Sequence, residues 1–241
     1  MTSQSTMFKD DPEYLKIKSE LDPLIIGFFS LGKLNRKYIQ FKKCLDDWNQ
    51  RFLKILPTIG TIDSLQRITI QPLFQKENEK DNERLKTVIG LFRYLGLVES
   101  LGGQFVDLSI LLLVANGYDF HVEREHDVPR IIHATTLRDL RNASLGVKAK
   151  FLERCNLKET TSLIDKDLRN SIAHLNFKIN EDGTVSARSQ GEQKAAINIY
   201  QKINEFNLKF TKLLIIFNEI QDHVFPHEKE FEKKIREMEK S

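Results

Sequence analysis

The stretch IYQKINEFNLKFTKLLIIF, residues 199–217, decides the fold class, because its apolar side chains follow a helical period. They recur every three or four residues, at Ile199, Ile203, Phe206, Phe210, Leu213 and Phe217. This spacing places them on one face of an α-helix. We therefore expect a long closing helix over residues 192–222, with that face buried against the rest of the protein.

The same period recurs upstream and predicts an all-α protein. A second stripe runs through Phe41, Leu45, Trp48, Phe52 and Ile55. Further helices are expected over residues 10–31, 37–56, 83–100, 104–117, 127–145, 148–155 and 160–175. The region 57–82 carries Pro57, Pro72 and the charged run QKENEKDNE. We interpret it as a turn-rich connection.

One segment departs from the helical period. In NFKINEDGTVSAR, residues 176–188, apolar and polar residues alternate on both sides of Asp182-Gly183. An Asp-Gly pair between alternating runs predicts a β-hairpin with a type I′ turn. The resulting organisation is an N-terminal helical region and linker (1–80), a helical domain (81–225) and a charged tail (226–241).

Composition restricts the class of protein only broadly. The chain has 241 residues, enough for one sizeable core or two small domains. Its 37 basic and 34 acidic residues give a net charge of +3, which permits a nucleic-acid partner without indicating one. Cys44 and Cys155 match no metal or redox spacing, and we expect reduced thiols. The longest apolar runs, 24–32 and 110–115, are too short for a membrane span, and MTSQSTMFKDD does not resemble a signal peptide. We expect a cytoplasmic protein without a membrane partner.

The stretch DLRNSIAHLNF, residues 167–177, carries the candidate chemistry. Asn170 and His174 are four residues apart and share a helix face. Arg169 and His174 are five apart, which separates them by about 140° around the axis and about 7.5 Å along it. A single copy of the motif therefore makes a strained active site, whereas a two-fold dimer would bring two arginines and two histidines to one cleft.

Purely structural roles explain part of this segment. Asp165 and Arg169 have the spacing of a helical ion pair, and Ser162 with Asp165 resembles a capping box. The tetrapeptide DLRN also occurs at 139–142, where Gly146 stands in the place of His174. The histidine therefore distinguishes the second copy from the first.

RNSIAH, residues 169–174, resembles the Rx4–6H signature of the HEPN superfamily at its shortest spacing. The order of helices, hairpin and closing helix over about residues 84–222 is also similar. The resemblance implies an all-α fold that dimerises through the motif face. It implies metal-independent RNA cleavage without a cofactor, as in toxins and antiviral effectors, with Arg169, Asn170 and His174 as the signature residues. Other members are inactive binding modules, for example partners of nucleotidyltransferase antitoxins.

The residue types fit RNA cleavage, since RNA carries its own nucleophile in the 2′-hydroxyl group. Histidine can move protons near neutral pH, and arginine can stabilise charge on phosphate oxygens. Asn170 could bind phosphate or position the histidine. Arg138 and Arg141 are candidate RNA-binding residues, and a solvated helix face explains them equally well.

Other histidines give weaker signals. His223 and His227 have a metal-like spacing, but Pro226 between them disrupts the required helix, so we expect no metal site. His121, His126 and His133 match no ligand pattern. Two non-catalytic interpretations stay open: a dimerisation or partner-binding module, and a helical scaffold in which the motif only packs.

Overall fold

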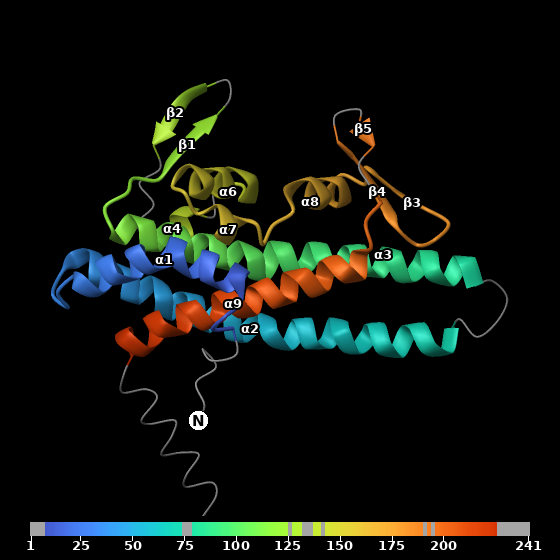
Figure 1. Ribbon diagram of the computed structural model, residues 1–241, viewed down its shortest axis with the longest axis horizontal. Helices are drawn as coiled ribbons and strands as arrows, with labels where there is room; N and C mark the ends of the chain where they lie inside the picture. Colours follow the sequence, from blue (N-terminus) through green and yellow to red (C-terminus); the bar gives the residue numbers. More distant parts are fainter. Residues whose placement is uncertain are drawn as a thin grey trace, which may run out of the picture.

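The computed structural model describes residues 8–73, 79–124, 127–131, 137–140, 143–189, 192–193 and 196–225. Long helices run side by side along the long axis of the molecule, and short helices and two small hairpins lie on one side of them (Figure 1). The prediction of an all-α bundle with a hairpin after the motif helix is confirmed. The predicted charged tail, 226–241, lies outside the described residues.

The two N-terminal helices, α1 (Pro12–Ser30) and α2 (Arg36–Leu73), are part of the bundle. Asp11 caps α1, because its carboxylate accepts a hydrogen bond of 2.8 Å from the backbone N–H of Tyr14. Phe28 of α1 stacks on Tyr38 of α2 with 4.9 Å between the ring centroids. The N-terminal helices therefore share an apolar core with the later ones.

A long, nearly continuous helix forms the centre of the bundle. It consists of α3 (Glu79–Leu97), a π-helical turn, η2 (Val98–Gly102), and α4 (Gly103–Ala115). The stretch Glu83–Ala115 is long and apolar enough to cross a membrane, but 72% of its most apolar window is buried inside the protein. Such burial is typical of the core helix of a soluble protein.

The closing helix α9 (Ile199–Val224) begins later than predicted, because Asn198 caps it by accepting from the N–H groups of Tyr200 and Gln201. Its apolar face meets the central helix through aromatic rings. Phe105 contacts both Phe210 and Phe217, with centroid distances of 5.0 and 5.4 Å. The predicted stripe is therefore the face that α9 buries.

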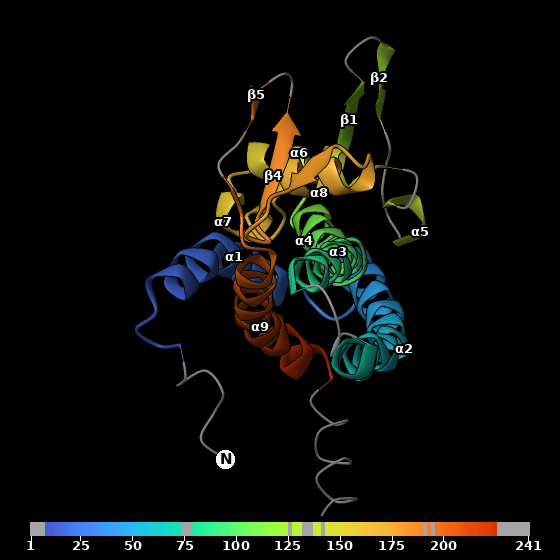
Figure 2. The ribbon, with the colours of Figure 1, turned by 90° about the vertical axis from the view of Figure 1, so that its right-hand side faces the viewer.

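Short helices lie along one side of the bundle, as the end view shows (Figure 2). They are α5 (Leu137–Leu140), α6 (Leu145–Arg154), α7 (Lys158–Thr161) and α8 (Lys166–Ala173). α6 packs on α4, and α8 packs on α3. The motif helix therefore lies directly on the central helix.

The predicted hairpin forms from β3 (Phe177–Ile179) and β4 (Val185–Ser189), with β5 (Glu192–Gln193) as a third antiparallel strand. Its turn differs from the expected type I′. Gly183 has a φ of +76°, and its N–H donates to the carbonyl of Asn180, whereas Asp182 does not have a positive φ. This is a three-residue loop with glycine in the left-handed position, which the dipeptide alone does not distinguish from a two-residue turn.

Two predicted elements were wrong. Residues 57–73, expected as a turn-rich connection, continue helix α2 through Pro57. The expected helix 127–145 begins instead as a strand, β2 (Asp127–Ile131), which pairs with β1 (His121–Arg124). Val128, Pro129 and Ile131 favour an extended edge strand over a helix, since proline is tolerated where no ladder hydrogen bond is needed.

Candidate active site on helix α8

Helix α8 is fixed at its start and along its inner face. The carboxylate of Asp165 accepts a hydrogen bond of 3.1 Å from the N–H of Leu168 and caps the helix. Leu168 and Ile172 are buried against the core. The opposite face, with Asn170 and His174, is therefore exposed to solvent.

Arg169 lies between these two faces and is held by two partners. Its Nε and Nη2 atoms contact the carboxylate of Glu99, which belongs to the π-helical turn η2. Its Nη1 atom donates to Oδ1 of Asn170 at 2.8 Å. The long side chain thus brings the guanidinium to Asn170, which is on the exposed face of α8.

His174 directly follows α8 as its C-cap residue and is exposed. Among the described residues none hydrogen-bonds its imidazole ring, so the ring can meet a ligand or a second subunit. The next residue, Leu175, has a left-handed φ of +53° and ends the helix. The N–H of Leu175 donates to Ile172 and that of Asn176 to Ser171, which is the hydrogen-bond pattern of a Schellman motif.

The arginine end of the motif opens into a cleft of about 290 Å³ between α8 and α6. Arg169 and Asn170 line it from α8, and Lys150 lines it from α6. His174 is not among the lining residues. The three signature residues therefore lie along one helix, with two of them at the cleft and the third beyond it.

The structural roles expected for this segment are only partly found. Arg169 pairs with Glu99 rather than with Asp165, so the expected helical ion pair was wrong. Asp165 is itself the helix cap, and the hydroxyl of Ser162 donates to the carbonyl of Glu159. The capping-box interpretation of Ser162 and Asp165 was therefore also wrong. Asn170 accepts from the arginine instead of positioning the histidine.

Of the two candidate RNA-binding arginines, Arg138 belongs to the described residues, and it does not line this cleft. Arg138 is exposed on α5, a helix that packs against α2 and α4. Arg141 lies outside the described residues, as do His126, His133 and His227. Arg138 therefore stays a separate candidate.

The described residues include no group of three or more side chains that could hold a metal ion together. His223, considered for a metal site, stacks on Phe29 with 3.9 Å between the ring centroids. Packing on Phe29 therefore accounts for the position of the His223 ring.

Two residues beside the motif were missed by sequence reasoning. Glu99 is 70 residues from Arg169 along the chain, and its helix gives no sequence signal of a contact. Lys150 lies on a helix that was predicted, but its position in the same cleft as Arg169 and Asn170 depends on the tertiary fold. The tertiary arrangement alone places these two residues beside the motif.

Comparisons with protein-family models, curated proteins and solved structures find no match to this chain.

Proposed function

We propose that this protein is a HEPN-like endoribonuclease that needs no metal ion and acts in the cytoplasm, in a toxin or defence setting. The observation that carries the proposal is the arrangement on α8. The guanidinium of Arg169 is turned to Asn170, on the face where His174 is exposed. A cation and a proton-transfer group are thus available to one phosphodiester.

The chemistry follows from the residue types. The imidazole of one histidine takes the proton of the 2′-hydroxyl group, whose oxygen then attacks phosphorus. Arg169 stabilises the negative charge that develops on the phosphorane oxygens. The bond from phosphorus to the 5′ oxygen breaks, and a protonated imidazole supplies the proton to that oxygen. The products are a 2′,3′-cyclic phosphate and a 5′-hydroxyl end.

This reaction needs a base and an acid, and one chain supplies one histidine in the motif. In a two-fold dimer the second copy of the motif supplies the other histidine. The exposed position of His174 is compatible with such a composite site, because a buried ring could not face another subunit. We therefore propose that the active species is a homodimer.

The test is cleavage of a fluorescent RNA in EDTA by the wild type, Arg169→Ala and His174→Ala. We expect each substitution to lower the rate by about 100-fold or more, the usual effect of removing an acid–base group or a transition-state donor. The control His223→Ala removes a histidine outside the motif and should retain cleavage. An RNA with a 2′-deoxy group at the cut position should stay intact.

Two outcomes would overturn the nuclease proposal: no cleavage by clean wild-type protein, or full activity of His174→Ala with unchanged circular dichroism. An active species that sediments as a single subunit would overturn the composite dimer site alone.

One observation favours a second function. Arg169 is already paired with Glu99, so its charge is balanced without a substrate. A non-catalytic module would use this face to dimerise or to bind a protein such as a nucleotidyltransferase antitoxin. In that case the wild type would form the complex. Neither the wild type nor the two variants would cut RNA.

A further inference from the structure

The cleft between α6 and α8 has a one-sided charge. Its lining includes the cationic side chains of Lys150, Lys166 and Arg169, and no described lining residue is acidic. The remaining lining consists of small, apolar or neutral polar residues such as Ser144 and Asn170. Its volume of about 290 Å³ is close to the lower end for ligand sites, about 300 Å³.

The acidic partners of Lys166 and Arg169 lie outside the lining. Glu153 pairs with Lys166 at 2.5 Å, and Glu99 pairs with Arg169. These pairs fix the two cations at the edge of the cleft. Lys150 is exposed, so we expect its substitution to have little effect on packing.

Two other clefts differ in charge. The cleft of about 190 Å³ beside Tyr94 contains Glu13, Asp165 and Glu205 together with its lysines. A groove of about 430 Å³ between α2 and α9 has Asp46 and, among its described lining residues, no cationic side chain. Of these three clefts, the one between α6 and α8 therefore suits an anion best.

With RNA as the substrate of the proposed function, the position of this cleft beside the motif indicates a phosphodiester as the anion. Asn170 lines it, and His174 lies four residues further along α8, about 6 Å along the helix axis. A strand of RNA that placed one phosphate between Arg169 and His174 would continue along α8 toward α6. The next phosphate on that side would then meet Lys150 and Lys166.

We propose that the cleft between α6 and α8 binds the phosphodiester adjacent to the cleaved one, with Lys150 and Lys166 as its contacts. This inference rests on RNA as the substrate of the proposed function, but it concerns binding and not cleavage. Lys150 and Lys166 act as RNA-positioning residues, since phosphate contacts fix the register of a nucleic acid.

The test measures binding of a fluorescent single-stranded 2′-O-methyl RNA by anisotropy over a range of salt concentrations. This probe lacks the 2′-hydroxyl nucleophile, so it reports binding without cleavage. Lys150→Gln should weaken binding several-fold at low salt and reduce the dependence of log K on log salt by about 0.7, the contribution of one phosphate contact. The control Lys43→Gln, on the exposed surface of α2, should bind like the wild type.

The outcomes separate this inference from the nuclease proposal. Equal binding by Lys150→Gln and the wild type overturns the cleft site, even if His174→Ala abolishes cleavage of ordinary RNA. Absence of binding by the wild type overturns it as well and favours a protein partner. Binding that depends on Lys150, without any cleavage, supports the cleft site and rejects the nuclease.

Discussion

Leu175, the residue after His174, adopts a conformation that favours glycine. Three helices end with the same pair of backbone hydrogen bonds and a left-handed residue: α4 with Gly117, α6 with Asn156 and α8 with Leu175. Glycine and asparagine tolerate this conformation, whereas a leucine there is strained by about 1–2 kcal/mol. The leucine side chain is 69% exposed, so burial does not offset the strain. Such strain is typical of functional sites.

We expect Leu175→Gly to raise the free energy of unfolding by about 0.5–1 kcal/mol, because relief of the strain exceeds the added flexibility of the unfolded chain. The matched control is Gly117→Ala, which introduces a side chain at a φ of +96° and should lower stability by about 1 kcal/mol. Chemical denaturation measures both changes. A less stable Leu175→Gly protein would show that backbone strain is absent at this position.

The face shared by Asn170 and His174 was predictable, because helical period alone places residues four apart on one side. The partner of Arg169 was not. Local spacing favoured Asp165, but that carboxylate instead caps α8, and Glu99 approaches from a helix distant in sequence. Contacts between helices depend on how the helices pack, and a single sequence contains no measure of that packing.

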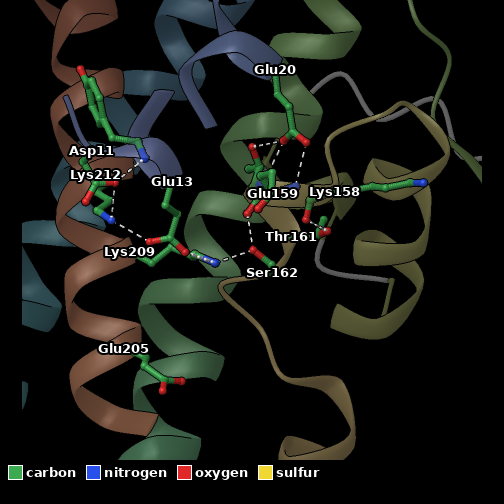
Figure 3. A network of polar contacts seen from close by, with 12 residues as sticks. Asp11, Glu13, Glu20, Lys158, Glu159, Thr161, Ser162, Glu205, Lys209 and Lys212 are labelled. Atoms are coloured by element: carbon green, nitrogen blue, oxygen red, sulfur yellow. Dashed lines mark hydrogen bonds and ion pairs between the residues drawn. The ribbon is translucent and has the colours of Figure 1, made fainter. Parts of the chain in front are cut away.

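At the scale of elements, α7 shows how a very short helix is held in place. Glu20 of α1 accepts hydrogen bonds from the N–H groups of Glu159 and Thr160 and from the hydroxyl of Thr160 (Figure 3). The distances are 2.7, 2.9 and 3.1 Å. A helix of four residues has few backbone hydrogen bonds of its own, so this carboxylate satisfies donors that would otherwise lack a partner.

We expect Glu20→Ala to destabilise the protein by about 1–2 kcal/mol, because it leaves the buried Thr160 without its acceptor. The matched control Asp22→Ala removes a carboxylate of the same helix that forms an ion pair with Lys18 near the surface, and it should change stability by less than about 0.5 kcal/mol. Thermal unfolding of the two variants measures the difference. Equal stability of both would rule out a capping role for Glu20.

The errors in element prediction have a common physical cause. Pro57 removes one hydrogen bond from α2, but the sequence around it keeps apolar residues at the helical spacing of four and three, as in Ile55, Ile59 and Ile62. The helical period outweighs Pro57. The segment 127–131 has too few residues for either period to be decisive, and its pairing with residues 121–124 determines its strand conformation.

For the whole molecule, a buried charge network joins the first helix to the last. Lys212 of α9 is 1% exposed, and its ammonium group contacts Asp11 at 2.9 Å and Glu13 at 2.7 Å. Lys209 contacts the other oxygen of Glu13 at 2.7 Å and donates to Ser162 in the chain between α7 and α8 (Figure 3). The network therefore holds α1, α9 and the start of the motif region in one arrangement.

This network makes stability depend on pH. The hydrogen bond from Lys212 lowers the pKa of Asp11. Burial alone would raise the pKa of Glu13, but hydrogen bonds from Lys209 and Lys212 outweigh it and lower that pKa. A carboxyl group with a lowered pKa binds fewer protons in the folded state. Its stabilising effect is therefore present above the unfolded pKa, about 3.9 for Asp and 4.3 for Glu, and is lost as pH falls through the folded value.

We expect Lys212→Met to lower the free energy of unfolding at pH 7 by about 1–3 kcal/mol. Removing one partner of a buried pair typically costs about 3–5 kcal/mol, and here the carboxylates are about a third exposed, so water compensates in part. The difference from the wild type should shrink as pH falls below about 4, because both carboxyl groups then become neutral in either protein. Urea denaturation at pH 7 and pH 3 measures the two differences, and the exposed variant Lys43→Met should match the wild type at both. A difference that stayed constant with pH would mean that Lys212 acts through packing of its side chain and not through its charge.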